Sequence, residues 1–255
     1  MMMIAPLTIS HAACKGHAPE NTMAGIHAAV TLGVDAIEID VHASRDGVPV
    51  LIHDERVDRT TDGTGAVRDL TLDQLRRLDA GARSFDGRFA GERVPMLAEV
   101  LDLTRNACLL VIEVKQPGIV EHIAEVVRRH RAADRAMIWS FHRDAVATAR
   151  AVLPEAPAAQ LWGGRTGDAA SLIEGTVQRG AQAISVQYSA VEPALVHAAR
   201  LRGLTVYTWT VDQPSDQARV AAAGVAGICT NLPDVLRETL TTEQYAGTYR
   251  ATTVG

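Results

Sequence analysis

The most constraining feature of this sequence is a regular alternation of short apolar strands and helical patterns along nearly the whole chain. Outside a hairpin near residue 50, a strand pattern is followed by a helix pattern eight times in 255 residues. This alternation favours a parallel sheet, because each helix carries the chain back to start the next strand. We predict strands at 7–11, 36–42, 109–114, 136–140, 158–161, 183–186, 204–210 and 227–230, with helices at 22–33, 96–105, 118–131, 142–153, 168–179, 193–202, 215–222 and 233–240.

Eight such units in a chain of this length are typical of a (β/α)8 TIM barrel. A doubly wound open sheet is the alternative, but it would need fewer strands or a glycine-rich G-x-G-x-x-G turn, which the sequence lacks. We therefore expect one TIM-barrel domain spanning residues 1–255. The alternation breaks off between about residues 54 and 94, where glycine-rich turns and one short helix pattern stand, so we predict a small inserted subdomain after the second barrel strand.

Composition narrows the functional classes. The hydrophobic fraction is 47% and the net charge is −5, with no basic stripe, which argues against nucleic acid as a partner. The three cysteines are far apart, unlike a disulfide framework or a zinc site. The chain begins without a signal-peptide pattern and contains no apolar run of the ~20 residues that a membrane span needs. We expect a soluble, cytoplasmic protein.

The second predicted strand carries two acidic residues, Glu38 and Asp40, within an apolar run. Side chains two residues apart point to the same face of a strand. Burying two unpaired carboxylates together is costly, and a divalent cation removes that cost. The alternative is a pair of carboxylates facing solvent at a sheet edge.

The Asp46-Gly47 dipeptide after this strand is a strong hairpin signal. If the chain folds back there, the numbers of paired residues sum to about 93. His53 then lies opposite Asp40 or Ile39, so the hairpin returns a histidine to the carboxylate pair.

The active site of a TIM barrel lies at the carboxyl ends of its strands. The polar or aromatic residues predicted there, with the hairpin histidine added, are His11, Glu38, Asp40, His53, Glu113, Lys115, Ser140, Gln187 and Trp209. Each of them alone has an ordinary structural explanation. Three carboxylates, two histidines and a lysine converging on one rim favour a catalytic metal site.

Chemistry suggests a role for each group. Glu38, Asp40 and Glu113 would hold one hard cation, Mg²⁺ or Ca²⁺, and the same oxygen ligands suit Mn²⁺. Lys115 would add a fixed positive charge near a phosphoryl group. His11 and His53 would act as general base and general acid on opposite sides of phosphorus, and the sequence leaves open which is which.

Several ordered motifs resemble the glycerophosphodiester phosphodiesterase family. They are His11, Pro19-Glu20-Asn21-Thr22, Glu38-Ile39-Asp40-Val41, Asp46-Gly47-Val48-Pro49-Val50, His53-Asp54, Asp58-Arg59-Thr60-Thr61, Pro95-Met96-Leu97-Ala98-Glu99, Glu113-Val114-Lys115, Trp209-Thr210-Val211 and the stretch from Gly227 to Asp234. The resemblance implies a TIM barrel with an insertion after the second strand. It also implies Glu38, Asp40 and Glu113 as metal ligands, and His11 and His53 as the acid–base pair. The implied reaction is hydrolysis of glycerophosphodiesters to glycerol 3-phosphate and an alcohol, a step of glycerol and lipid metabolism.

One position departs from the family, which usually has His-Arg-Gly where this chain has His11-Ala12-Ala13. We hypothesise that Lys15, in the same loop, supplies the missing positive charge, although lysine lacks the bidentate grip of arginine. The alternative is that Lys15 is a solvated loop residue. We also expect Glu20 and His17 to contact substrate or metal.

Trp209 is expected to form an apolar wall at the mouth of the site. Cys14 is expected to be a packing residue, because the sequence shows no activating Cys–His pair around it.

Three alternatives remain at this stage. Within the same barrel, the enzyme could be a lysophospholipase D, or a lyase in which a substrate hydroxyl forms a cyclic phosphate. The missing arginine also leaves open a non-catalytic barrel that binds a phosphate ester. A TIM-barrel aldolase or isomerase fits less well, since it would use a central Schiff-base lysine without so many carboxylates.

Overall fold

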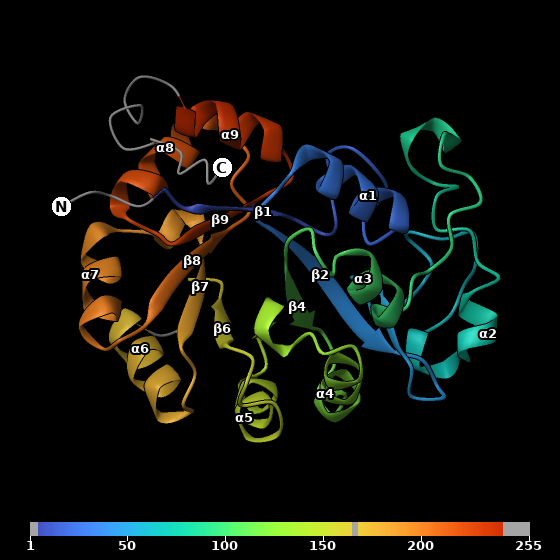
Figure 1. The fold of residues 1–255 in the computed structure, drawn as a ribbon, viewed down its shortest axis with the longest axis horizontal. Helices are drawn as coiled ribbons and strands as arrows, with labels where there is room; N and C mark the ends of the chain where they lie inside the picture. Colours follow the sequence, from blue (N-terminus) through green and yellow to red (C-terminus); the bar gives the residue numbers. More distant parts are fainter. Residues whose placement is uncertain (1–4, 165–167, 242–255) are drawn as a thin grey trace.

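A closed barrel of parallel strands forms the centre of the computed structural model, which describes residues 5–164 and 168–241 (Figure 1). The strand order of the described sheet is β1-β9-β8-β7-β6-β5-β4-β2-β3, and β1 also pairs with β2, which closes a ring of eight parallel strands. The strands are β1 (Leu7–Ser10), β2 (Ala36–Ala43), β3 (Pro49–Leu51), β4 (Leu109–Val114), β5 (Ala136–Ser140), β6 (Ala158–Trp162), β7 (Ala183–Gln187), β8 (Thr205–Trp209) and β9 (Gly227–Thr230). The predicted (β/α)8 TIM barrel is confirmed.

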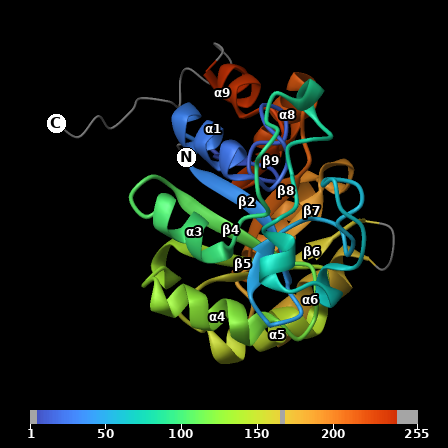
Figure 2. The same ribbon diagram turned by 90° about the vertical axis from the view of Figure 1, so that its right-hand side faces the viewer.

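Helices follow the parallel strands and surround the barrel (Figures 1 and 2). The α-helices are α1 (Met23–Leu32), α2 (Leu72–Leu75), α3 (Leu97–Leu103), α4 (Val120–Arg129), α5 (Arg143–Val152), α6 (Ala169–Gln178), α7 (Pro193–Leu201), α8 (Pro214–Ala223) and α9 (Pro233–Thr241). Short 3-10 helices are η1 (Val67–Asp69), η2 (Phe85–Gly87), η3 (Ala133–Arg135) and η4 (Tyr188–Ala190). Among the residues described, no helix combines the length and the apolar composition that crossing a lipid bilayer requires.

Helix α1 illustrates how local sequence sets the element boundaries. The Thr22 side chain accepts a hydrogen bond from the Gly25 backbone and caps the first turn. Gly33 ends the helix at a φ of 65°, where its N–H bonds to the carbonyls of the last turn. These two signals set the first and last residues of α1, and the chain then enters β2, which pairs with β1.

Apolar side chains pack in two layers. One layer lies between the sheet and the helices, and the other fills the barrel interior. The interior layer consists of Ile9, Ala36, Val111, Trp139, Ala159, Leu161, Ala183, Tyr207 and Cys229. Polar side chains that point to the same side of these strands but come later in them therefore lie above this interior layer (the interior plug), at the carboxyl ends of the strands.

Strand β3 folds back antiparallel on β2, as the Asp46-Gly47 signal predicts. The observed register pairs Val41 with Leu51 and His42 with Val50, so the sums are 92, which corresponds to Ile39 of the two positions predicted opposite His53. The reason is a three-residue loop between Ser44 and Val48, with Gly47 at a φ of 79°. Such loops end in a left-handed residue and shift the register by one position.

A long excursion separates β3 from α3 and contains η1, α2 and η2. It stands beside the carboxyl end of β2 (Figure 1), and the view from that side shows it in front of the strands (Figure 2). It has a small apolar cluster of its own, formed by Val50, Ile52, Val57, Val67, Leu75, Ala80 and Val94. Helix α2 begins with a capping box between Thr71 and Gln74. The excursion thus forms one wall of the barrel mouth.

Candidate active site

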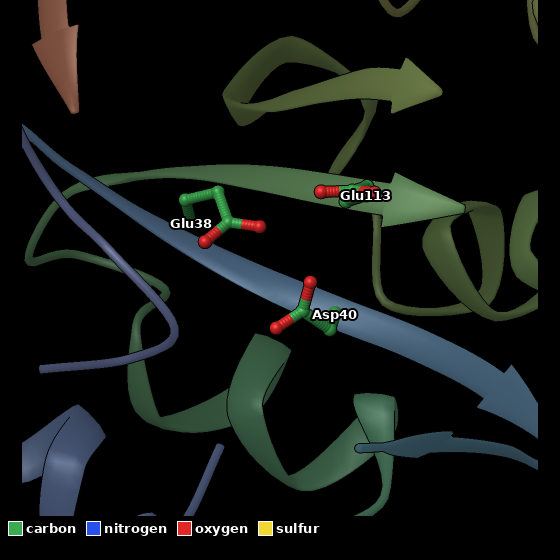
Figure 3. A group of neighbouring side chains, drawn as sticks. All are labelled: Glu38, Asp40 and Glu113. Atoms are coloured by element: carbon green, nitrogen blue, oxygen red, sulfur yellow. The ribbon is translucent and has the colours of Figure 1, made fainter. Parts of the chain in front are cut away.

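Three acidic side chains from two adjacent strands meet above the interior plug, and we call them the carboxylate cluster. Glu38 and Asp40 share one face of β2, and the parallel register places Asp40 beside Glu113 of β4. Each offers a carboxylate oxygen, and these three oxygens lie within 4.8 Å of one another. Their carboxyl groups turn toward a common space (Figure 3). The structure thus brings these three residues together, as predicted.

The carboxylate cluster is poorly compensated by positive charge. Glu38 and Asp40 are buried, and burial together with the charges of Asp40 and Glu113 raises the pKa of Glu38 well above its usual range. Burial likewise raises the pKa of Glu113. Lys115 Nζ lies 2.8 Å from Glu113 Oε1 and 3.2 Å from Asp40 Oδ1. One lysine therefore faces three carboxylates.

The donor set fits a divalent cation. Among the described residues, Glu38 Oε1 and Asp40 Oδ1 are buried oxygen atoms that accept no hydrogen bond, although the Lys115 ammonium lies 3.2 Å from Asp40 Oδ1. Buried carboxylate oxygens without donors are costly unless a cation binds them. Carboxylate oxygens are the preferred ligands of Mg²⁺ and Ca²⁺. These residues could therefore hold one such ion and leave positions open for substrate oxygens.

The loop after β1 holds the second carboxylate oxygens of Glu38 and Asp40. The Ala12 backbone N–H donates to Glu38 Oε2 at 2.8 Å, in a stretch where Ala12 and Ala13 have φ values of 46° and 69°. Asn21 Nδ2 donates to Asp40 Oδ2 at 2.7 Å, and Asn21 Oδ1 accepts from the Asp40 N–H at 3.0 Å. The sequence indicated Asn21 only as part of a motif, without a role. The loop orients the ligands with backbone and amide groups that carry no net charge.

His11, at the end of β1, is held by two residues that sequence analysis did not single out. Asp212 accepts a hydrogen bond from Asn231 Nδ2 at 2.7 Å, which turns Asn231 Oδ1 toward His11 Nδ1 at 2.8 Å. His11 Nδ1 must therefore donate, which leaves Nε2 of the neutral ring as the acceptor. Burial lowers the pKa of His11 and favours this neutral form. The only signal in the sequence was a polar residue directly after a predicted strand.

His53, which follows β3, has a different partner. Its Nδ1 lies 2.8 Å from Asp54 Oδ1. His53 and His11 are close enough to influence each other electrostatically, and His53 also interacts with Glu113 in this way. The hairpin therefore brings His53 to the rim as predicted. A carboxylate supports His53, whereas a neutral amide supports His11.

Asp54 belongs to a second group of charges, which we call the arginine network: Lys15, Glu20, Asp54 and Arg59. Arg59 donates to Asp54 Oδ2 at 2.7 Å and to Glu20 Oε2 at 3.1 Å. Lys15 Nζ lies 2.7 Å from Glu20. Although burial opposes the change, Arg59 and Lys15 lower the pKa of Glu20 to about 2. The hydrogen bonds from Arg59 also lower the pKa of Asp54. Both acids in this network are matched by cations.

One other predicted contact residue, His17, lies outside both groups. His17 Nε2 lies 3.3 Å from Asp234 and its Nδ1 lies 3.6 Å from Cys14 Sγ, so the structure does not bring His17 to the carboxylate cluster. This Cys–His contact was not foreseen, but Cys14 is fully buried and burial raises the pKa of its thiol. A buried, protonated thiol suits a packing residue.

The strand-end residues Ser140, Gln187 and Trp209 were also expected at the rim. Ser140 donates to the Val114 carbonyl at 2.8 Å, and Gln187 accepts from Ser189, so both have local structural partners. Trp209 is partly exposed and meets the exposed Phe141 edge to face, with ring centroids 5.4 Å apart. The two rings form an apolar surface at the carboxyl ends of β5 and β8.

Comparisons with known proteins agree on one family. Residues 11–235 match the model of the glycerophosphoryl diester phosphodiesterase family. A glycerophosphodiester phosphodiesterase of Caldanaerobacter subterraneus is 36% identical over 239 residues, which cover 90% of this chain and 96% of the relative. A putative glycerophosphoryl diester phosphodiesterase from Silicibacter pomeroyi superposes with a TM-score of 0.85 at 30% identity, covering 94% of each chain.

A phosphodiesterase from Oleispira antarctica was solved in complex with the product sn-glycerol-3-phosphate. It superposes with a TM-score of 0.86 at 26% identity, and the match covers 93% of this chain and 98% of the other.

Proposed function

This chain belongs to the glycerophosphoryl diester phosphodiesterase family, and on that premise we propose that it hydrolyses glycerophosphodiesters to glycerol 3-phosphate and an alcohol. The observation that carries the proposal is the carboxylate cluster of Glu38, Asp40 and Glu113, which has a single lysine and interacts electrostatically with two histidines that have different partners. The product-bound Oleispira antarctica relative supports the choice of substrate.

Because the two histidines have different partners, we assign them different roles in acid–base catalysis. His11 is neutral, and Asn231 fixes its Nδ1 as a donor, so Nε2 is free to take a proton from an attacking water. His53 is paired with Asp54, which balances the charge of a ring carrying two protons. We therefore assign His11 as the general base and His53 as the general acid that protonates the departing alcohol oxygen.

The phosphoryl group would lie against the carboxylate cluster. A divalent cation held by Glu38, Asp40 and Glu113 would supply positive charge to the phosphoryl oxygens, whose negative charge grows during the reaction. Lys115 already lies beside two of the three ligands and adds a second, permanent positive charge at the same place. Asn21 and the Ala12 N–H keep the carboxylates oriented while substrate binds.

Two further residues act on the substrate in this proposal. Trp209, with Phe141 against it, offers an apolar wall for the carbon chain of the substrate. Lys15 compensates for the arginine that the family usually has at the position of Ala12. Its ion pair with Glu20 holds the lysine in the loop directly above β1. Glu20 then acts by positioning Lys15 and Arg59.

The experiment that tests this function begins with metal-stripped protein and glycerophosphocholine or glycerophosphoethanolamine. Mg²⁺, Ca²⁺ and Mn²⁺ are added back in turn, and released glycerol 3-phosphate is measured with its dehydrogenase. We expect release only when a divalent ion is present. Thermal unfolding under the same conditions should show a higher Tm with the ion, because an ion that binds only the folded state stabilises it.

Phosphorus NMR of the reaction mixture separates the proposed hydrolysis from its alternatives. We expect glycerol 3-phosphate to accumulate directly. A persistent cyclic phosphate would replace the hydrolase with a lyase. Substrate binding without turnover, whichever ion is supplied, would refute the proposed function and leave a phosphate-ester binding barrel.

A further inference from the structure

A cavity of about 290 Å³ opens beside the carboxylate cluster, and we call it the Lys115 cavity. Its walls come from three parts of the chain that meet at the mouth of the barrel: the start of the excursion, the end of β2 and the loops after β4 and β5. The side chains that matter for its chemistry are His42, Glu55, Arg56, Arg68, Lys115 and His142. This volume suits the head group of a small phosphodiester.

The Lys115 cavity adjoins the reacting groups on the His53 side. Lys115 contacts both Asp40 and Glu113, so one wall of the cavity is also part of the phosphoryl site. His42 is buried, and its Nε2 lies 3.3 Å from the His53 carbonyl oxygen. A group that occupies this cavity therefore lies one side chain away from the phosphoryl site, across Lys115, and from the backbone of His53, across His42.

Positive charge predominates in this cavity. Its lining includes Arg56, Arg68 and Lys115 but only one acidic residue, Glu55. Arg56 is paired with Asp58 at 3.0 Å, outside the lining. Arg68 is exposed on η1, and no carboxylate of the described residues lies within ion-pair distance of it. Arg68 thus has its charge available to an occupant.

The lining also lacks the groups that recognise a quaternary ammonium. Choline and similar cations are bound by the faces of aromatic rings, and no Phe, Tyr or Trp lines the Lys115 cavity. The two imidazoles present, of His42 and His142, each lie at hydrogen-bond distance from a backbone carbonyl. A cationic head group would meet like charge here without a compensating aromatic cage.

From this geometry we infer that the Lys115 cavity receives the departing alcohol, and that the protein prefers glycerophosphodiesters whose alcohol carries a negative charge over those whose alcohol is a quaternary ammonium. The inference rests on the proposed function. It adds the chemical class of the leaving alcohol, a phosphate- or carboxylate-bearing group that accepts hydrogen bonds from Arg68 and Lys115.

A second cavity, of about 310 Å³, lies on the other side of the arginine network and offers a contrast. Two of its three cations, Lys15 and Arg59, are already paired with Glu20, and the third, Arg83, is exposed. The Phe85 ring also lines this cavity. The two cavities have the same balance of three cations and one acid, but only the second has an aromatic ring, so it is the better of the two for a cationic alcohol. A preference for choline would therefore place the alcohol in the second cavity and overturn the inference.

The test uses three diesters of a two-carbon alcohol whose nitrogen substituents carry different charges. They are glycerophosphodiesters of N-succinylethanolamine, N-acetylethanolamine and choline, which carry a negative, a neutral and a positive group. All three release glycerol 3-phosphate, so one assay on the metal-loaded protein compares their kcat/KM values. We expect the succinyl diester to exceed the choline diester by about 10-fold, the scale of one charge-assisted contact. Added salt should reduce this ratio, because the cavity is open to solvent.

Arg68→Glu is the diagnostic variant, because Arg68 is exposed and its substitution should leave the fold intact. We expect the succinyl-to-choline ratio to fall to about one or below. Arg202→Glu is the matched control, since Arg202 is an exposed arginine after α7, at the amino end of the barrel. It changes the total charge equally and should keep the wild-type ratio. Equal kcat/KM for the three diesters in the wild type would refute the inference while leaving the hydrolase intact.

Binding distinguishes a failure of the inference from a failure of the proposed function. Calorimetric titration of the metal-loaded His11→Ala variant with the succinyl and choline diesters measures preference without turnover. Tighter binding of the succinyl diester, lost when Arg68→Glu is added, supports the inference even if no diester is hydrolysed by the wild type. Equal affinities would refute it in either case.

Discussion

Two groups of acidic residues at the same rim of the barrel differ in their counter-charges. In the carboxylate cluster, three acids share one lysine, and the pKa of Glu38 is raised. In the arginine network, two acids are matched by Arg59 and Lys15, and the pKa of Glu20 is lowered. The first group has fewer positive charges than acids, and the second does not. Residue type alone would have described both as acidic clusters, so the counter-charge is what separates a ligand site from a structural support.

In the proposed reaction, both groups act on the same bond of the substrate. The carboxylate cluster would hold the phosphoryl group through its ion, and the arginine network supports His53 through Asp54. Substitutions should therefore produce different defects. A change in the carboxylate cluster should abolish ion binding, whereas a change in the arginine network should weaken the acid and the local fold while ion binding persists.

The largest effect is expected for Glu38→Gln. Glutamine keeps an acceptor for the Ala12 N–H but removes one ligand charge. We expect kcat/KM to fall by about 10³-fold, on the scale of lost electrostatic stabilisation. The ion should no longer raise the Tm, while the metal-free Tm should not fall, because one repelling charge is gone. Glu174→Gln, an exposed acid on α6, is the control. A wild-type response to the ion in Glu38→Gln would remove the distinction between the two groups.

Arg59→Met should produce the next largest effect. It leaves Asp54 and Glu20 without their shared guanidinium, so His53 loses its fixed support. We expect kcat to fall by about 30- to 100-fold with little change in KM, together with a loss of about 1–3 kcal/mol of stability. Arg59→Lys should recover part of kcat, because a lysine restores charge but not the bidentate geometry.

Arg77→Met is the matched control for Arg59→Met, since Arg77 is an exposed arginine of the same excursion whose one ion pair within residues 5–164 and 168–241 is with Asp73. Ion-dependent stabilisation should survive in both variants. Its loss in Arg59→Met would mean that the arginine network and the carboxylate cluster act as one unit.

The arginine network also predicts a pH dependence of stability. The pKa of Glu20 falls from 4.5 to about 2 on folding, so its contribution is present above pH 4.5 and is lost as the pH falls toward 2. Glu20→Gln should therefore be less stable than wild type by about 1–3 kcal/mol at pH 6, with the gap narrowing by pH 3. Urea unfolding of both proteins at the two pH values measures this gap. A gap that stays constant would show that Glu20 contributes by packing and not by charge.

The smallest effect is expected for Lys15→Ala. If Lys15 replaces the arginine that is absent at Ala12, KM should rise by about 10-fold with kcat nearly unchanged. Lys15→Arg should keep KM close to the wild-type value. An unchanged KM in Lys15→Ala would limit Lys15 to its ion pair with Glu20 and refute the compensation hypothesis.

Most of the fold followed from patterns that are local in the chain. The strands at 109–114, 136–140 and 227–230 lie where apolar runs and turn signals placed them, because each pattern depends on neighbouring residues. The pairing of Glu38 and Asp40 on one face followed from the two-residue period of a strand. The hairpin register could be predicted only to within one residue, since a turn signal does not specify whether the loop has two residues or three.

Contacts between distant residues were not predictable in the same way. Asn231 and Asp212 hold His11 at the point where the barrel closes. Asn231 and His11 are 220 residues apart in the chain. Likewise, Arg59 of the excursion reaches Glu20 of the loop after β1. No local period relates these positions, because their proximity depends on how the whole ring of strands closes.

By itself, therefore, the sequence determined the barrel, the side of it that bears the polar residues, and the identity of the acids and histidines that converge there. Only the tertiary structure decided which acids have counter-charges and which histidine has a neutral partner. Secondary structure and side-chain direction repeat with the backbone and can be read locally, whereas the ionic state of a buried group depends on charges that folding brings to it from elsewhere in the chain.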